Sequence, residues 1–231
     1  MRFGIISAGE GSRLATEGFG QPKPLVPIDG VPMIERLIRI FMGCSAERIA
    51  VIVNGKSLET VRFLEQLAGE MPIDLVIKST PTPMHSLMEL APYLGADRFC
   101  VTTVDTVFSE KGFSAMMDEF AETCCDGLMG VTPFVDDEKP LYVSVDSGMM
   151  INGFFDEMAG CKYVSAGVYA LRSSAFEVLK ECVESGQTRM RYFQRRLLES
   201  GLRLKAFDLG QVVDVDHVSD IAKAQHIAVQ Q

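Results

Sequence analysis

A glycine-rich segment near the start of the chain contains the residue types that hold phosphate groups. In ISAGEGSRLATEGFGQPKPL (6–25), Gly9 and Gly11 let the backbone approach a ligand and expose successive N–H groups to anionic oxygens. Arg13 follows two residues later and can bind phosphate through two parallel hydrogen bonds. Lys23 stands between two prolines, which stiffen the loop and restrict where its ammonium points. This combination predicts a site for a polyphosphate.

Two other known loops and an ordinary surface loop are the alternatives. A dinucleotide-binding loop needs G-x-G-x-x-G at the opening of a helix, but Leu14 replaces the third glycine and we expect the loop to run on to Pro22. A dehydrogenase is also disfavoured because Asn54 and Gly55 stand where an acid would follow the second strand. A P-loop needs G-K-[ST], which the segment lacks. The coincidence of G-x-G, Arg and P-K-P at the end of a strand favours a ligand site over a plain loop.

Short apolar runs alternate with amphipathic segments over the first half of the chain. The runs predict strands at 2–7, 48–54, 74–78 and 98–104. Apolar residues at helical spacing predict helices at 32–42, 57–68, 84–93 and 111–122, with Ser57 as a cap of the second. This alternation is typical of a mostly parallel sheet with helices on both faces.

The second half has a different pattern. Three strand-like segments, 127–134, 141–146 and 149–155, are expected to form an antiparallel insertion. Further strands are predicted at 163–171, 203–207 and 212–215, and helices at 173–184, 190–200 and 218–228. No linker is long or polar enough to divide the chain, so we expect one domain over 1–231. The change of pattern divides this domain into a first half, from 1 to about 125, and a second half, from about 126 to 231.

Composition and charge exclude several classes of protein. The chain has 231 residues, of which 47% are hydrophobic and 23% charged, as in ordinary globular proteins. It carries 31 acidic and 22 basic residues, a net charge of −9 that disfavours binding to nucleic acid. No apolar run approaches the roughly 20 residues of a membrane helix, and the start lacks a signal-peptide pattern. We therefore expect a cytoplasmic protein whose six cysteines are reduced and mostly in the core.

The glycine-rich segment resembles the signature of the sugar-phosphate nucleotidyltransferases. G-x-G-x-R-L at 9–14 and P-K-P-L at 22–25 match it, and VPIDGVPMIERLIRIF continues the similarity. TTVDT, VSAGVYAL and VVDVDHVSDIAKAQ extend it, at lower specificity, over nearly the whole chain. The resemblance implies an α/β fold of the nucleotide-diphospho-sugar transferase type: a Rossmann-like, mostly parallel mixed sheet with helices on both faces and a small antiparallel insertion.

The resemblance also implies a reaction. A nucleoside triphosphate (NTP) and a phosphorylated small molecule give a nucleotide-activated product and pyrophosphate, without a covalent enzyme intermediate. Both reactants are anions, so the protein must position them and neutralise charge. The resemblance makes the first half of the domain, 1 to about 125, the nucleotide-binding half and the second, about 126 to 231, the acceptor-binding half. Arg13, Lys23 and Asp105 are then the expected catalytic residues. The expected nucleotide-binding residues in the loop are Ala8, Gly9, Gly11, Ser12, Arg13 and Lys23.

Carboxylates at two further positions are expected to hold Mg²⁺, a cation that prefers oxygen ligands. Asp105 directly follows the strand 98–104, where the family has a metal-binding Asp; the alternative is a turn or capping residue. Asp214 and Asp216 are two residues apart on an expected strand and would face the same way. Their alternative role is to cap the helix at 218–228. The sequence does not decide which of the two contacts the metal.

The base and acceptor sites are predicted from weaker similarities. In the family, the loop STPTPMHS touches the base, which makes Thr82 and Ser86 candidates; the alternative is a plain loop with Ser86 as a helix cap. The strand containing Gly167 resembles the one that lines the acceptor site. Many relatives carry Glu-Lys-Pro shortly before it, but Asp-Glu-Met-Ala (156–159) stands here, leaving Lys162 as the nearby cation.

The expected function is transfer of a nucleoside monophosphate to a sugar 1-phosphate. Because the Glu-Lys-Pro lysine is missing, a phosphocholine-type cytidylyltransferase stays open as an alternative. A nucleotide-binding regulatory module without catalysis is the other alternative, and the complete set of acids and cations argues against it. The partners would be an NTP and the acceptor, with no nucleic acid and no membrane.

Overall fold

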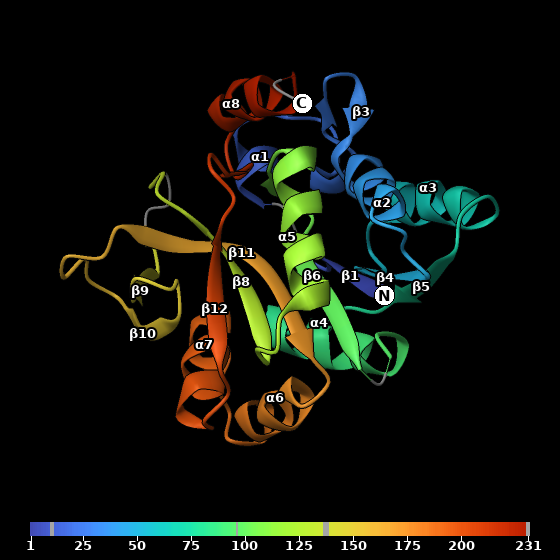
Figure 1. The fold of residues 1–231 in the computed structure, drawn as a ribbon. Helices are drawn as coiled ribbons and strands as arrows, with labels where there is room; N and C mark the ends of the chain where they lie inside the picture. Colours follow the sequence, from blue (N-terminus) through green and yellow to red (C-terminus); the bar gives the residue numbers. More distant parts are fainter. Residues whose placement is uncertain (10–11, 96, 136–138, 230–231) are drawn as a thin grey trace.

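The computed structural model describes residues 1–9, 12–95, 97–135 and 139–229. A nine-stranded sheet runs in the order β10-β9-β11-β6-β1-β4-β5, with β8 paired to β11 and β12 paired to β8 (Figure 1). Its strands are β1 (Arg2–Ser7), β4 (Arg48–Val53), β5 (Ile73–Ile77), β6 (Arg98–Thr103), β8 (Gly127–Thr132), β9 (Tyr142–Val145), β10 (Ile151–Phe155), β11 (Tyr163–Arg172) and β12 (Leu204–Asp208). The predicted α/β class with a mostly parallel sheet is confirmed.

The parallel part of the sheet is built around β1. Ile5 in β1 lies opposite Val51 of β4 on one side and Thr102 of β6 on the other. Both faces of these strands are buried, which explains their nearly continuous apolar sequences. The chain moves from β1 out to β4 and β5 and then crosses to β6 on the other side of β1. The topological switch point, where open α/β sheets bind ligands, therefore lies between the carboxyl ends of β1 and β6.

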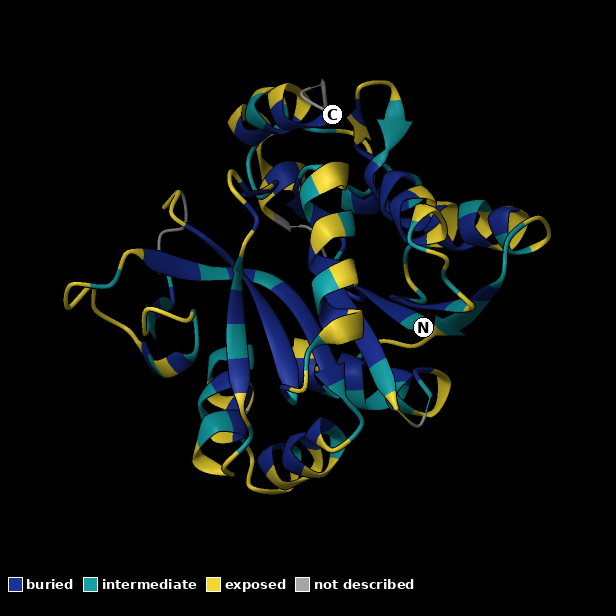
Figure 2. Ribbon diagram, in the orientation of Figure 1, coloured by how far each residue is buried: buried dark blue, intermediate teal, exposed yellow. Residues whose placement is uncertain are grey.

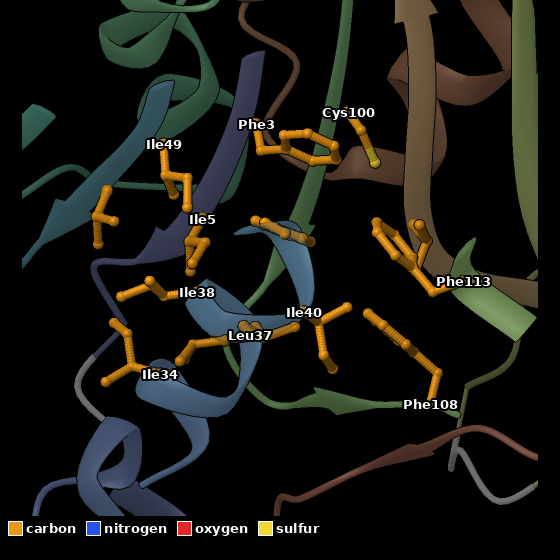
Figure 3. Close-up of a cluster of buried hydrophobic side chains, with 14 of the residues drawn as sticks. Phe3, Ile5, Ile34, Leu37, Ile38, Ile40, Ile49, Cys100, Phe108 and Phe113 are labelled. Atoms are coloured by element: carbon orange, nitrogen blue, oxygen red, sulfur yellow. The ribbon is translucent and has the colours of Figure 1, made fainter. Parts of the chain in front are cut away.

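Helices cover both faces of the sheet, and alternate residues of each strand pack toward opposite faces. One core cluster joins the sheet to α2 (Met33–Gly43), α3 (Leu58–Ala68) and α5 (Glu110–Glu122). The other joins it to α4 (Pro83–Leu90), α6 (Ala175–Glu184) and α7 (Met190–Glu199). Figure 3 shows Ile5 of β1 packing toward Ile38 of α2, and the ring of Phe3 stacks on that of Phe41 in the same helix. The outward faces of these helices are exposed, while the central strands β1, β4, β6 and β8 are mostly buried (Figure 2).

The second half departs from the expected insertion. Only β9 and β10 form an antiparallel hairpin at the edge, and it projects to the left in Figure 1. The third segment, β8, lies inside the main sheet, antiparallel to β11 and parallel to β12. It is buried along its whole length, and the alternation of apolar residues did not distinguish this central strand from an inserted one.

Short elements gather at the carboxyl edge of the sheet and pack in a third cluster. They are α1 (Ser12–Thr16), the 3-10 helix Lys23–Leu25, the hairpin of β2 (Pro27–Ile28) and β3 (Val31–Pro32), the pair of β7 (Thr106–Val107) and β13 (Val213–Asp214), and α8 (Val218–Val229). We expected an uninterrupted loop to Pro22, but α1 forms there. Leu14, which breaks the glycine pattern, is fully buried and anchors α1 in this cluster.

Three local expectations, on a helix cap, on the end of a helix and on the burial of the cysteines, are met only in part. Ser57 occupies the N-cap position of α3, but its hydroxyl bonds the Thr60 hydroxyl and no backbone N–H. The helix expected at 84–93 ends as α4 at Leu90 and continues as the 3-10 helix Ala91–Tyr93. All six cysteines are unpaired, yet only Cys100, Cys125 and Cys182 are buried. None of the helices in the described ranges is long and apolar enough to span a membrane.

Candidate active site

Lys23 is at the centre of a group of charges at the switch point. Its Nζ lies 2.6 Å from Asp105 Oδ2 and 2.6 Å from Asp216 Oδ1. Arg13 Nη1 reaches the other oxygen of Asp216, Oδ2, at 2.7 Å. The structure thus brings the two loop cations together with two of the three predicted metal ligands. These four side chains come from α1, the 3-10 helix, the end of β6 and the segment after β13.

Backbone pairing explains why the acids meet. Asp105 follows β6, and its carbonyl accepts a hydrogen bond from the Val215 N–H at 3.0 Å. β13 pairs antiparallel with β7, which places Asp214 opposite Thr106. β13 ends at Asp214, so Asp216 lies outside the strand, and the expectation that both residues share one strand is corrected.

The environment of Lys23 keeps it charged. Only 12% of its side chain is exposed. Burial pushes the pKa of Lys23 down, but attraction to Asp105 and hydrogen bonds to Asp105 and Asp216 outweigh this, and the pKa is raised overall. Pro24, next to Lys23, is buried and fixes the short helix from which the ammonium extends. Lys23 is therefore a positioned, permanent positive charge.

Asp214 experiences the opposite balance. Part of the Asp214 side chain is exposed to solvent, but many protein atoms surround its carboxylate. This loss of hydration, followed by the negative charges of Asp105 and Asp216, raises the pKa of Asp214 to about 7. Lys23 therefore does not fully neutralise the acids around it, and the site retains an excess of negative charge.

Two cavities flank the charged group. One, of about 610 Å³, is lined by Ser7 and Gly9 at the end of β1, by Lys23, by Asn54 after β4 and by Phe19 and Leu58. The other, of about 310 Å³, is lined by Arg13, Asp214, Asp216, Thr132, Ser165 and Lys223. Lys23 lines the first cavity and bonds Asp216, which lines the second, so ligands in the two cavities would meet at these charges.

The first cavity contains a buried polar atom without a partner. Ser7 is 4% exposed, and its Oγ has no hydrogen-bond partner among the described residues. Such an orphan is unusual in folded proteins and often marks a place where a ligand or water bonds. Sequence analysis missed Ser7 because we read it only as the last residue of a strand.

The N-terminus of α8 is capped by residues other than the predicted acids. Glu17 Oε2 accepts from the Val218 N–H at 2.8 Å, and Asp220 Oδ2 accepts from the His217 N–H at 2.8 Å. Glu17 also pairs with His217, which raises the pKa of His217 and lowers that of Glu17. The capping role considered for Asp214 and Asp216 is therefore filled by Glu17 and Asp220, neither of which sequence analysis had singled out.

The remaining predicted residues of the loop are only partly placed. Ala8 is buried, Gly9 lines the larger cavity and Ser12 begins α1. Gly11 lies outside the described residues.

The predicted base-binding residues do not line either cavity. Thr82 caps α4 by accepting from the His85 N–H, and the buried Ser86 hydroxyl bonds Thr80. Their assignment as nucleotide-binding residues stays a prediction.

The two predicted acceptor residues have different positions. Gly167 has a positive φ of 70°, and a Cβ there would come within 3.3 Å of Thr106 Oγ1, so it lies beside the strand pair that carries Asp214. Lys162 is exposed and donates to the Tyr163 hydroxyl at 3.1 Å, and it lines neither cavity. The structure brings Gly167 toward the charged group and leaves Lys162 apart.

A metal site made by protein side chains alone is not formed. In the part of the chain that the structure describes, no group of three or more His, Cys, Asp or Glu side chains is placed to hold a metal ion. Lys23 stands between Asp105 and Asp216, where we expected the carboxylates to face one another across an open metal site.

A family model described as the MobA-like NTP transferase domain matches residues 4–201. The chain belongs to this family. It is 22% identical over 227 residues to the bifunctional protein GlmU of Methanococcus maripaludis, a match that covers 95% of this chain and 52% of the relative. The chain thus spans about half the length of the curated relatives that it matches over most of its own length.

Two solved structures have a similar fold. A putative glucose-1-phosphate thymidylyltransferase from Bacillus anthracis aligns with a TM-score of 0.84 at 21% identity, over 99% of this chain and 95% of that one. The inositol-1-phosphate CTP transferase of T. maritima aligns with a TM-score of 0.77 at 19% identity, over 98% and 97%. The predicted nucleotide-diphospho-sugar transferase fold is confirmed, and the chain is a member of a nucleotidyltransferase family.

Proposed function

We propose that the protein transfers a nucleoside monophosphate from an NTP to a phosphorylated small molecule, foremost a sugar 1-phosphate, and releases pyrophosphate. The observation that carries this proposal is the position of Lys23, charged and 2.6 Å from both Asp105 and Asp216. It lies at the switch point, between two cavities. Membership in a nucleotidyltransferase family supports the reaction class.

The larger cavity is the proposed nucleotide site. Gly9 and Lys23 line it, and the unpaired hydroxyl of Ser7 gives it a polar contact that no protein group uses. An NTP there would place its α-phosphate near Lys23. Arg13 pairs with Asp216 at the other cavity, and because its side chain is half exposed it could exchange that carboxylate for phosphate oxygens.

The smaller cavity is the proposed acceptor site. Arg13 and Lys223 line it and can hold the acceptor's phosphate, although the lysine of the Glu-Lys-Pro motif is missing. An oxygen of that phosphate would attack the α-phosphorus from the side opposite the pyrophosphate. Lys23 and Arg13 would reduce the repulsion between the two anions and stabilise the charge that develops on the leaving group.

Mg²⁺ is the proposed cofactor, and the donor set fits it. Carboxylate oxygens are its preferred protein ligands, and it needs only one or two of them when phosphates supply the rest. Asp105 and Asp214 or Asp216 would hold it, because these three carboxylates lie around only two cations, Lys23 and Arg13, and so offer oxygen ligands with a net negative charge. When bound, the cation would neutralise charge on the reacting phosphates.

A pyrophosphate-release assay tests the proposal. The four common NTPs are each combined with a panel of sugar 1-phosphates, inositol 1-phosphate and phosphocholine, with Mg²⁺ or with chelator. We expect release with at least one pair, lost in chelator. Asp105→Asn should abolish release, whereas Asp118→Asn on α5 should not. Binding of an NTP without release for any acceptor would instead support a regulatory module.

A further inference from the structure

The larger cavity lies against the N-terminus of α3, and no side chain caps this end of the helix. Ser57 occupies the N-cap position, but its hydroxyl bonds Thr60 Oγ1 at 2.7 Å and leaves the first N–H groups of the helix without a cap. Ser57, Leu58 and Glu59 all line the cavity. Uncapped N–H groups and the positive end of a helix dipole attract anions. The neighbouring side chains show whether this N-terminus holds a ligand.

Asn54 can offer the cavity donors only. It lines the cavity and is 7% exposed. Its Oδ1 accepts from the Lys56 backbone N–H at 3.0 Å and from the Ser79 hydroxyl at 2.7 Å. A backbone N–H can only donate, so the side-chain atom that faces it must be the oxygen and not the nitrogen. Both lone pairs of Oδ1 are used, and Asn54 can therefore give a ligand only the two N–H groups of Nδ2.

Ser7 adds a buried hydroxyl next to Asn54. In the parallel register of β1 and β4, Ser7 lies opposite Val53, and Asn54 is the next residue of the chain. Ser7 Oγ is buried and has no hydrogen-bond partner among the described residues. A buried hydroxyl without a partner costs free energy, which a ligand that accepts its proton would recover. This hydroxyl points to a ligand independently of the helix N-terminus.

The charged side chains of the cavity favour an anion. Of the described residues that line it, Lys23 and Lys56 are cationic and Glu59 is anionic. Two positive charges against one negative charge give a net charge of +1, although the whole chain has a net charge of −9. Glu59 is the opposing group, because it is exposed in the first turn of α3 and competes with a ligand for the helix N-terminus.

We propose that Ser7, Asn54 and the first turn of α3, here called the α3 wall, bind the β- and γ-phosphates of the NTP and the pyrophosphate that they become. This inference rests on the proposed function, in which the α-phosphate lies near Lys23. As an acceptor oxygen bonds to the α-phosphorus, the bond from that phosphorus to the bridging oxygen breaks, and its electron pair leaves on pyrophosphate. The charge that develops there meets donors that are already in place.

A diphosphate suits the α3 wall better than a nucleobase does. Phosphate oxygens accept hydrogen bonds at every point, and both buried polar side chains of the wall, Ser7 and Asn54, can donate. A base edge carries N–H groups beside its acceptors, and Asn54 has no lone pair left to receive them. Binding of the base or the ribose at this wall is the alternative that the experiment must separate.

Calorimetric binding tests the inference without turnover. The probes are inorganic pyrophosphate and the mono- and triphosphates of the four common nucleosides, each with Mg²⁺. Asn54→Asp keeps the two hydrogen bonds that Oδ1 accepts but puts a negative oxygen in place of the donor. It should weaken binding of pyrophosphate and of the triphosphate roughly tenfold to a hundredfold, and leave binding of the monophosphate unchanged. Asn152→Asp, exposed on β10, is the control for the added negative charge and should change none of them.

Two further substitutions should change pyrophosphate binding in opposite directions. Ser7→Ala should weaken it roughly tenfold, because a hydrogen bond to a charged oxygen is lost. Without ligand this variant should melt no lower than the wild type, since the hydroxyl that it removes has no partner among the described residues. Glu59→Gln should tighten pyrophosphate binding, because it removes the carboxylate that opposes the anion. Thermal melts of each variant confirm that it is folded.

Two results would overturn the inference while leaving the proposed function intact. The first is an equal loss of monophosphate and triphosphate binding in Asn54→Asp and Ser7→Ala, which would place the base or the ribose at the α3 wall. The second is unchanged pyrophosphate binding in both variants. If no acceptor supports release with any NTP, the proposed function fails, and a selective loss of pyrophosphate binding in Asn54→Asp would still support the phosphate subsite.

Discussion

Replacing Lys23 by alanine removes the positive charge at the centre of the site, and the structure gives the size of the effect. Lys23 makes two charged hydrogen bonds of 2.6 Å, and only 12% of its side chain is exposed, so solvent screens them little. Each such bond contributes about 1.5–3 kcal/mol. Two effects make the loss smaller. The substitution removes the cost of burying the ammonium, and both acids are partly exposed to solvent, 24% for Asp105 and 38% for Asp216. We expect a net loss of about 1–3 kcal/mol in unfolding free energy.

The assay is a thermal melt of the metal-free protein, followed by titration with Mg²⁺. For a domain of this size the expected loss lowers the Tm by roughly 2–12 °C. Because the acids are left without their cation, Mg²⁺ should raise the Tm of Lys23→Ala more than that of the wild type. Turnover should fall roughly tenfold to a hundredfold or more, because one charged phosphate contact is lost.

Lys180→Ala, an exposed position on α6, is the matched control for loss of one lysine charge. It should change neither the Tm nor turnover appreciably. The reasoning is refuted if Lys23→Ala has the same Tm as the Lys180→Ala control and binds NTP as tightly as the wild type. Lys23 would then contribute neither to stability nor to NTP binding, although it lies close to two acids.

Three further predictions concern single residues of the site and its surroundings. Asp214→Asn should stabilise the metal-free protein. The pKa of Asp214 is about 7 in the folded protein and 3.8 in the unfolded chain, so ionisation of this group destabilises the wild type as pH rises from about 4 to 7. The variant has no such group and should not lose stability in this way. The side chain opens to water, which limits the gain to about 1 kcal/mol, read from melts across pH. Gly167→Ala should cost about 1–2 kcal/mol, since φ is 70° and the new Cβ lies 3.3 Å from Thr106 Oγ1; an unchanged Tm would contradict this. Thr82→Ala should cost about 0.5–1 kcal/mol by removing the cap of α4, measured in urea; equal stability would show that the cap contributes nothing.

The fold was predictable where apolar periodicity and topology rules agree. β1, β4, β5 and β6 are short apolar runs separated by amphipathic helices, and parallel strands buried on both faces require that pattern. β8 is equally apolar, but its position depends on pairing with β11 and β12, which lie far away in sequence. Local periodicity carries no information about such partners, and the segment was therefore assigned to the insertion.

The site was predictable to the extent that it lies at strand ends. Asp105 lies near Arg13 and Lys23 because the carboxyl ends of β6 and β1 share one edge of the sheet, and the pairing of β13 with β7 brings Asp216 to the same edge. The pairing of Lys23 with the acids was not predicted, because it depends on how a stiff loop folds back over that edge. The hydrogen bonds of Gln194, in α7, to Ser165 and Tyr169, in β11, were not predicted either, because only the packing of the helix on the strand brings these residues together.

The span of chain closed by the Arg13–Asp216 ion pair has a consequence for the order of assembly. These residues are 203 positions apart, and Asp214 and Asp216 follow β12, the last strand of the main sheet. During synthesis the amino-terminal parts emerge and begin to fold first, so every strand of that sheet has been made before either acid exists. The sheet must therefore acquire its order without help from the site's charges. A growing chain can therefore form its hydrophobic core before it can carry out the proposed reaction. The site is complete only when the residues that lead into α8 have been made.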